Sequence, residues 1–143
     1  MKQCSRGSPV NCGQEIRLEH ITTNRNLHSH HFGSPLSNAQ EVSAFGDDGE
    51  GDSGDVWTVV CEGDFWQRAE PIMFKHVATG VFLGASGHTF GRPINGQMEI
   101  VGLSMPDIST KYFIFCRFFI FECYGSTLLF QVEDCRGSLC SPI

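Results

Sequence analysis

The 143-residue chain lacks most of the signals that direct a protein to a compartment or a partner class. Residues 1–10 contain no apolar run, so we expect no signal peptide, and the end of the chain, 139–143, is no retention signal. No Asn-x-Ser/Thr sequon offers a site for N-glycosylation. With 10 Lys and Arg against 16 Asp and Glu, and no basic stripe, we predict no nucleic-acid partner.

The chain also lacks the patterns of helical, zinc-binding and membrane proteins. No segment shows the apolar period of a helix. The 7 cysteines include no Cys-x-x-Cys pair, so they predict no zinc site, and their odd number leaves the redox state open. The Phe-rich run 112–121 is interrupted by Arg117 and followed by Glu122, so no membrane span is expected. A hydrophobic content of 41% still predicts a domain with a real core.

The most informative feature that is present is an internal repeat. Residues 16–27 align without a gap with 72–83, with identical Ile, His, Thr and Leu at four of the twelve positions. Residues 35–42 then align with 93–100, because the second copy has two extra residues in the intervening loop. A repeat of this length marks a supersecondary unit that buries its apolar face against its copies.

Each copy predicts a series of short strands. The first strand, 16–20 or 72–76, alternates apolar and polar residues with the two-residue period of a strand. Further strands are expected around Leu27 and Leu83, at 41–45 and 99–103, and at 56–60. Short strands separated by Gly, Pro, Asn and Asp predict an all-β barrel or sandwich.

Residues that recur in both copies are interpreted as scaffold. His20 and His76 occupy equivalent positions, and a single ligand rarely needs the same group in every repeat, so we expect both to be buried or hydrogen-bonded. Trp57 and Trp66 are expected to fill the core and the junction between repeats, the alternative being a platform on which a sugar stacks.

Two segments of the first copy have no counterpart in the second and form the candidate functional surface. His28 and His30 share a strand face that could hold a metal, but no third ligand of suitable spacing is visible, so we predict no metal site. The acidic loop 47–55 fails the EF-hand pattern because Ser53 stands where glycine is needed, and it is interpreted as solvated and partner-facing. The candidate partner surface comprises His28, His30, His31, Asp47, Asp48, Glu50, Asp52 and Asp55.

No catalytic or cofactor-binding residue is predicted. Residues 51–55, Gly-Asp-Ser-Gly-Asp, match the serine-protease nucleophile loop over four positions. The chain is too short for two barrels carrying a positioned His and Asp, so chance explains the match.

Several stretches of both copies resemble MIR repeats, specifically those of the stromal cell-derived factor 2 family. In the first copy they are Arg6 to Gln14, Asn26 to Phe32, Ser34 to Asn38, Gln40 to Asp52 and Asp55 to Val59. In the second copy the resemblance runs through Phe74-Lys75-His76 and Gly91-Arg92-Pro93-Ile94 to about Lys111. The Gly-Ser-Pro-Val opening and the Ser-Asn before Gln-Glu-Val favour the "like" paralogue of that family.

The resemblance implies a β-trefoil of MIR repeats, of which two of the usual three are present here. The expected organisation is a remnant of a preceding repeat or linker at 1–6, MIR repeats at 7–61 and 62–111, and a non-family, irregular hydrophobic tail at 112–143. The second repeat is expected to have an altered last strand.

The resemblance also implies a function in the endoplasmic-reticulum lumen. We expect a non-catalytic adaptor in protein folding and quality control whose partners are luminal Hsp40- and Hsp70-type chaperones and unfolded clients. Since the chain lacks a signal peptide and a retention signal, translation as given would leave it in the cytosol. The alternatives are a carbohydrate-binding β-trefoil module, with glycans as ligands, and an accessory MIR domain of a protein O-mannosyltransferase.

Overall fold

The computed structural model describes residues 9–20, 22–48, 50–67 and 70–110, and the backbone of two strands at 119–123 and 126–130. In chain order the elements are β1 (Glu15–Ile16), β2 (Glu19–His20), β3 (Arg25–Gly33), β4 (Gln40–Phe45), the 3-10 turn η1 (Ser53–Asp55), β5 (Trp57–Val60), β6 (Met73–His76), β7 (Phe82–Thr89), β8 (Met98–Leu103), η2 (Ile108–Thr110), β9 (Phe119–Cys123) and β10 (Ser126–Phe130).

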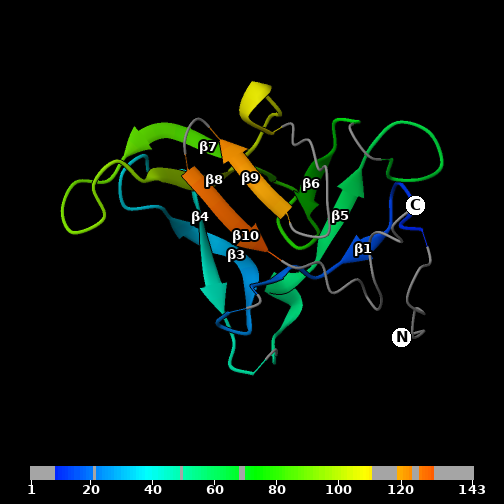
Figure 1. The fold of residues 1–143 in the computed structure, drawn as a ribbon, viewed down its shortest axis with the longest axis horizontal. Helices are drawn as coiled ribbons and strands as arrows, with labels where there is room; N and C mark the ends of the chain where they lie inside the picture. The colour runs from blue at the N-terminus through cyan, green and yellow to red at the C-terminus, as the bar shows by residue number, and fades with distance from the viewer. Residues whose placement is uncertain are drawn as a thin grey trace.

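Eight of the described strands form a curled antiparallel sheet in the order β1-β5-β6-β7-β8-β4-β3-β2. Figure 1 shows the curl of this sheet, with every strand but β2 labelled. The prediction of an all-β, trefoil-type fold is confirmed. β9 and β10 form a separate antiparallel pair. We expect an irregular tail, but these two segments form strands, and three of their ten residues are Phe, which favours strands. Within the described residues, no helix has the length and apolar character to cross a bilayer.

The internal repeat is visible in the strand register. In the first copy, Ser29 pairs with Val42, and in the second copy Ala85 pairs with Ile100, so the two hairpins β3–β4 and β7–β8 have the same geometry. In both hairpins the register shifts at equivalent places, between Ser29 and Gly33 in the first copy and between Ala85 and Thr89 in the second. The two extra residues of the second copy therefore lie in the tip of hairpin β7–β8, as the alignment predicts.

The first strand of the first copy is interrupted, in contrast to the continuous strand predicted over 16–20. β1 pairs with β5 and β2 pairs with β3, with Arg17 and Leu18 between them. Each half of the segment 15–20 therefore pairs with a different strand. Between the two halves, the carbonyl of Leu18 accepts a hydrogen bond from Leu27 N–H at 2.7 Å. In the second copy the equivalent strand, β6, stays continuous over its length.

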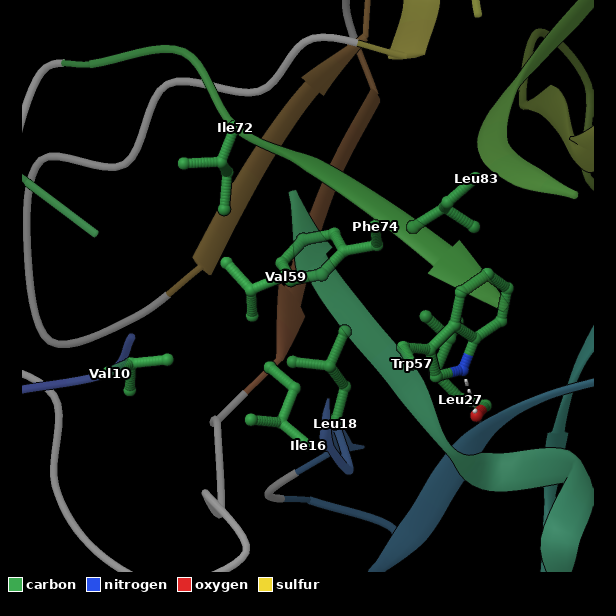
Figure 2. Packing of buried hydrophobic residues seen from close by; sticks show 9 residues of the cluster. All are labelled: Val10, Ile16, Leu18, Leu27, Trp57, Val59, Ile72, Phe74 and Leu83. Atoms are coloured by element: carbon green, nitrogen blue, oxygen red, sulfur yellow. Dashed lines mark hydrogen bonds between the residues drawn. The ribbon is translucent and has the colours of Figure 1, made fainter. Parts of the chain in front are cut away.

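The core lies between β1, β5 and β6. Trp57 and Phe74 are fully buried at its centre, and the Trp57 indole N–H donates to the carbonyl of Leu27 at 2.9 Å, as Figure 2 shows. The other buried members are Val10, Ile16, Leu18, Leu27, Val59, Ile72 and Leu83. Because Trp57 is buried and its polar atom is satisfied, it cannot act as a platform for a sugar.

A disulfide joins Cys12 to Cys61, 49 residues apart. The two cysteines lie at the start and the end of the first repeat, so the bond closes that repeat into a covalent ring. The odd number of cysteines concealed this pair at the level of sequence. A disulfide of this kind fits an oxidising compartment.

Candidate functional site

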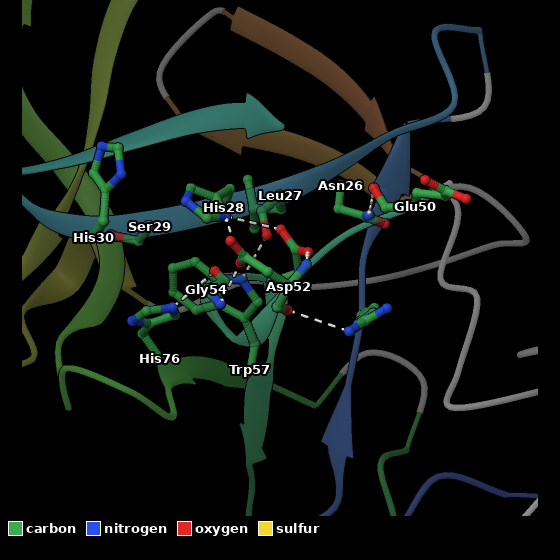
Figure 3. A network of polar contacts seen from close by, with 12 residues as sticks. Asn26, Leu27, His28, Ser29, His30, Glu50, Asp52, Gly54, Trp57 and His76 are labelled. Atoms are coloured by element: carbon green, nitrogen blue, oxygen red, sulfur yellow. Dashed lines mark hydrogen bonds and ion pairs between the residues drawn. The ribbon is translucent and has the colours of Figure 1, made fainter. Parts of the chain in front are cut away.

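The turn η1 is held between two histidines that come from different repeats. The imidazole of His28, on β3, lies directly against the α-carbon of Gly54, and a Cβ at residue 54 would collide with the Cε1 atom of that ring. On the other side, His76 Nε2 lies 2.9 Å from the Gly54 carbonyl oxygen. Since a carbonyl only accepts, Nε2 carries the proton and donates it. Figure 3 shows both rings converging on this turn.

His28 is paired with a buried carboxylate. Its Nδ1 lies 2.9 Å from Asp55 Oδ1 and 3.5 Å from Asp52 Oδ1. The other oxygen of Asp55 accepts the backbone N–H of Asp52, and Asp52 Oδ1 accepts Gly54 N–H at 2.7 Å, which forms a capping box at the turn. Asp55 is fully buried, and each of its two carboxylate oxygens has a partner, His28 Nδ1 for one and the Asp52 N–H for the other.

His76 belongs to a polar chain that joins the repeats. Its Nδ1 lies 2.7 Å from the Thr79 hydroxyl, and that oxygen also accepts from Gln40 Nε2 at 2.7 Å. Gln40 donates to Ser29 Oγ in the first repeat as well. Burial lowers the pKa of His76 and outweighs the Gly54 carbonyl, which acts in the opposite direction. A neutral ring with the proton on Nε2 satisfies every one of these bonds.

The first repeat has a partial copy of the same contact. His20 Nδ1 lies 2.8 Å from the Thr23 hydroxyl, as His76 Nδ1 does from Thr79. His20 is half-buried, whereas His76 is fully buried. Both residues therefore organise the turn that follows their strand. Trp66, the remaining residue interpreted as scaffold, is half-buried and packs edge-to-face on Phe74 with ring centroids 5.9 Å apart.

In the second repeat the glycine lies on the hairpin strand and the larger residue lies on the 3-10 turn, the reverse of the first repeat. Gly84 stands where His28 does, and Ser109 of η2 stands where Gly54 does. A Cβ on Gly84 would meet Ser109 Oγ at 3.0 Å, and Ser109 Oγ accepts the backbone N–H of Ala85 at 3.1 Å. The side chain between hairpin and turn is thus that of His28, from the hairpin, in the first repeat, and that of Ser109, from the turn, in the second.

The structure separates the eight residues of the candidate partner surface into two groups. His28 and Asp55 are buried beneath the surface, where they fix the turn. His30 is half-buried, and the exposed members are His31, Asp47, Asp48, Glu50 and Asp52. The surface available to a partner therefore consists of His30 and His31 on β3 and of the acidic loop.

Three groups with metal-ligand chemistry lie close together in this region. Donor atoms of His28, Asp52 and Asp55 all fall within 4.8 Å of one another. Spacing in the sequence predicted no third ligand beside His28, because Asp52 and Asp55 come from a loop that folds back over β3. The Nδ1 atom and the three oxygens described above are already engaged with one another or with the backbone. The hydrogen bonds of a capped turn therefore account for the closeness of these three side chains.

The His28–Asp55 pair has the form of a catalytic His–Asp couple, but the described residues place no nucleophile against the His28 ring. Phe45 stacks on the His28 ring, with centroids 4.4 Å apart and planes 28° from parallel. Within the described ranges, no hydroxyl or thiol is hydrogen-bonded to the second nitrogen of the ring.

Comparison with known proteins agrees with this architecture. The family model described as "MIR domain" matches residues 1–60. The chain is 58% identical over 107 residues to stromal cell-derived factor 2-like protein 1 of Homo sapiens, covering 75% of this chain and 48% of the relative. It is 58% identical over 103 residues to stromal cell-derived factor 2 of Mus musculus, covering 72% of this chain and 49% of the relative. These equal identities do not separate the two paralogues.

Solved structures give the same result. The SDF2-like protein from Arabidopsis thaliana superposes with a TM-score of 0.72 at 32% identity, covering 77% of this chain and 64% of that chain. A protein O-mannosyltransferase complex of S. cerevisiae bound to the sugar donor superposes with a TM-score of 0.65 at 22% identity, covering 87% of this chain and 17% of that chain, which shows the shared fold alone. The chain spans about half the length of the curated relatives it matches. The repeat, the fold and these relatives together make this chain an MIR-domain protein of the stromal cell-derived factor 2 family.

Proposed function

We propose that this chain is a non-catalytic adaptor in endoplasmic-reticulum protein folding and quality control. Its partners on this proposal are luminal Hsp40- and Hsp70-type chaperones and unfolded clients. The family of the relatives supports the luminal location, and the Cys12–Cys61 disulfide is compatible with it.

The observation that carries the proposal is the asymmetry between two hairpins that share one backbone geometry. The first repeat presents His31 and four exposed carboxylates, those of Asp47, Asp48, Glu50 and Asp52. The corresponding part of the second repeat, 104–108, contains a single carboxylate, that of Asp107. Asp52 and Asp107 cap η1 and η2 in the same way, since Asp52 Oδ1 accepts Gly54 N–H and Asp107 Oδ1 accepts Ser109 N–H, each at 2.7 Å. The unshared carboxylates are therefore those of Asp47, Asp48 and Glu50, and these exposed side chains are best explained by a partner.

The acidic loop is also rigidly placed at its C-terminal end, which a recognition surface needs. Asp52 is fixed by its bond to Gly54 N–H, and its carbonyl accepts from Arg17 Nη2 at 3.2 Å. Asn26 Nδ2 donates to the Glu50 carbonyl at 3.3 Å, which ties the loop to β3. A loop held at both residues loses little conformational freedom when it binds.

The test is binding of the purified full chain to a purified luminal Hsp40-type chaperone, measured by biolayer interferometry at low and high salt. Reversal of the loop charges, Asp47→Lys with Asp48→Lys and Glu50→Lys, should weaken binding at least about tenfold and reduce its salt dependence. The matched control reverses three exposed carboxylates outside the loop, Glu62→Lys, Asp64→Lys and Glu70→Lys. Equal binding by both triple variants would reject the acidic loop as the adaptor surface.

A further inference from the structure

The turn η1 covers His76 at the junction of the two repeats. The His76 side chain is fully buried, and the carbonyl oxygen of Gly54 lies 2.9 Å from its Nε2 atom. The indole of Trp57 packs against the same ring, with centroids 4.7 Å apart, and Figure 3 shows the ring beside both residues. Because η1 covers the Nε2 edge of the ring, withdrawal of this turn would expose His76 to solvent.

The hydrogen bonds around His76 are matched to a neutral ring. Nε2 donates to Gly54, and Nδ1 faces the Thr79 hydroxyl at 2.7 Å. The Thr79 oxygen accepts an N–H of Gln40, and its own hydrogen is donated to Nδ1. A proton on Nδ1 would force Thr79 to turn that hydrogen away and to accept from two donors at once. The closed turn therefore fits the neutral imidazole better than the imidazolium.

Titratable groups face His76 from β3 and from η1. β3 contributes His28 and His31, which disfavour a second proton on the ring, and η1 contributes the buried Asp55, which favours one. On β6 itself, Lys75 is exposed on the opposite face of the strand. Two further neighbours of the ring are uncharged, Trp57 of β5 and Thr79 of the turn after β6. The charged neighbours thus act in opposite directions.

Burial decides this balance. It lowers the pKa of His76 below the ordinary value of 6.5 and outweighs both the Gly54 carbonyl and Asp55, which raise it. If η1 withdraws, the ring meets solvent and its pKa returns to the ordinary value. Below that pH a proton binds the open form more tightly than the closed form. The ratio of open to closed chains then rises by up to about tenfold per pH unit, until the closed form is protonated as well.

The turn that covers His76 also anchors the acidic loop 47–55 at its C-terminal end. The Asp52 carboxylate accepts the N–H of Gly54, and the Asp55 carboxylate accepts the N–H of Asp52. The exposed carboxylates of the loop lie directly before this anchor, and a turn that leaves His76 takes their anchor with it. The protonation of one buried ring is therefore linked to the position of the acidic loop.

We propose that His76 and η1 form a pH-sensitive switch that holds the acidic loop in place when the ring is neutral and releases it on acidification. Release of the loop weakens its contact with the partner. The switch rests on the adaptor function proposed above and supplies its regulation. His76 acts in it as a positioning residue, because its ring contacts η1 and not the partner.

Hydrogen–deuterium exchange of the full chain at pH 7.5 and pH 5.5 tests the opening step, with rates corrected for the intrinsic effect of pH. The amides of 52–55 should exchange at least about threefold faster at the lower pH, while those of β8 keep their protection. His76→Gln should abolish the acceleration, because glutamine offers an N–H to the Gly54 carbonyl but does not titrate. His20→Gln is the matched control and should keep it, since His20 makes the same threonine contact in the first repeat.

The wild-type measurement decides the outcome even if a variant fails to fold. No acceleration at 52–55, or an equal acceleration in β8, overturns the switch. Equal acceleration in wild type and His76→Gln assigns the response to another group and overturns it as well.

Binding to the Hsp40-type chaperone at the same two pH values separates the switch from the adaptor proposal. Between pH 7.5 and pH 5.5 the Kd of wild type should rise at least about threefold more than that of His76→Gln. A complex whose Kd changes equally in both proteins overturns the switch and leaves the adaptor proposal intact. Absence of a complex at pH 7.5 overturns the adaptor proposal, whereas opening of the loop in the exchange experiment would still support the switch.

Discussion

The imidazole of His28 rests on the bare α-carbon of Gly54, and the second repeat inverts this pairing with Gly84 beneath Ser109. Each repeat therefore has room for one side chain between its hairpin and its 3-10 turn, supplied from opposite sides in the two copies. In the first repeat the side chain carries a donor, and the buried Asp55 receives it. The contact explains why glycine, histidine and aspartate occur together in this repeat.

The pairing predicts that Gly54→Ala destabilises the fold. The added methyl collides with the His28 ring and approaches the Ser29 carbonyl oxygen at 2.9 Å, so we expect a loss of about 2 kcal/mol in the free energy of unfolding. Urea denaturation of Gly54→Ala, His28→Ala and the double variant measures the coupling. The two losses should fail to add by about 1 kcal/mol. Additive losses would show that the ring and the glycine do not constrain each other.

Thr79 and Thr23 provide a matched pair for the hydrogen bonds to histidine. Thr79→Val keeps the side-chain shape but leaves Nδ1 of the buried His76 and one N–H of the half-buried Gln40 unpaired, so we expect a loss of about 2 kcal/mol. Thr23→Val removes a bond of similar length at an exposed residue and should cost no more than about 0.5 kcal/mol. Chemical denaturation of both variants checks the difference, and a larger loss for Thr23→Val would contradict the assignment of His76 as the buried anchor.

Acidification should destabilise the chain in two steps. The pKa of His76 is lowered from 6.5 by burial, so its contribution is complete above pH 6.5 and is lost as the pH falls towards the folded-state pKa, because the unfolded chain binds the proton first. The pKa of Glu99 is lowered from 4.5, so its stabilising contribution holds above that value and is lost as the pH falls through the folded-state pKa. Unfolding free energies measured against pH should show both steps. His76→Gln should remove the upper step and keep the lower one; an unchanged upper step would assign it to another group.

Reduction of the Cys12–Cys61 disulfide should lower stability without changing the fold. The bond closes a ring of 49 residues' separation, for which chain entropy gives about 4 kcal/mol. Thermal melts of the full chain with and without a reductant, and of Cys12→Ser with Cys61→Ser, measure the loss. The double variant should be insensitive to reductant. If wild type is also insensitive, the pair does not form in solution.

Much of the fold follows from sequence because the repeat imposes it. The alternation around Phe74 and the matched hairpins of 35–42 and 93–100 correctly predict the strands and their relation. The interruption of the first strand at Arg17 does not follow, since its two halves pair with different neighbours. That choice depends on tertiary contacts, which a two-residue period does not encode.

The site was predictable only in part. Its segments were identified because they break the repeat, but their burial was not, so His28 and Asp55 were grouped with exposed residues. Aligning η1 with η2 would have exposed the exchange of Gly54 for Ser109, and with it the partner of His28. No sequence pattern indicates the Cys12–Cys61 disulfide, because the two cysteines are 49 residues apart and come together only when the repeat folds.

Hydrogen–deuterium exchange of the full chain, alone and with a purified luminal Hsp40-type chaperone, tests the central claim most directly. The account predicts a complex in which amides of 30–52 in the first repeat become protected, while the equivalent segment of the second repeat, 86–107, exchanges as before. Protection confined to the second repeat, or no complex at concentrations up to about 100 μM, would contradict it.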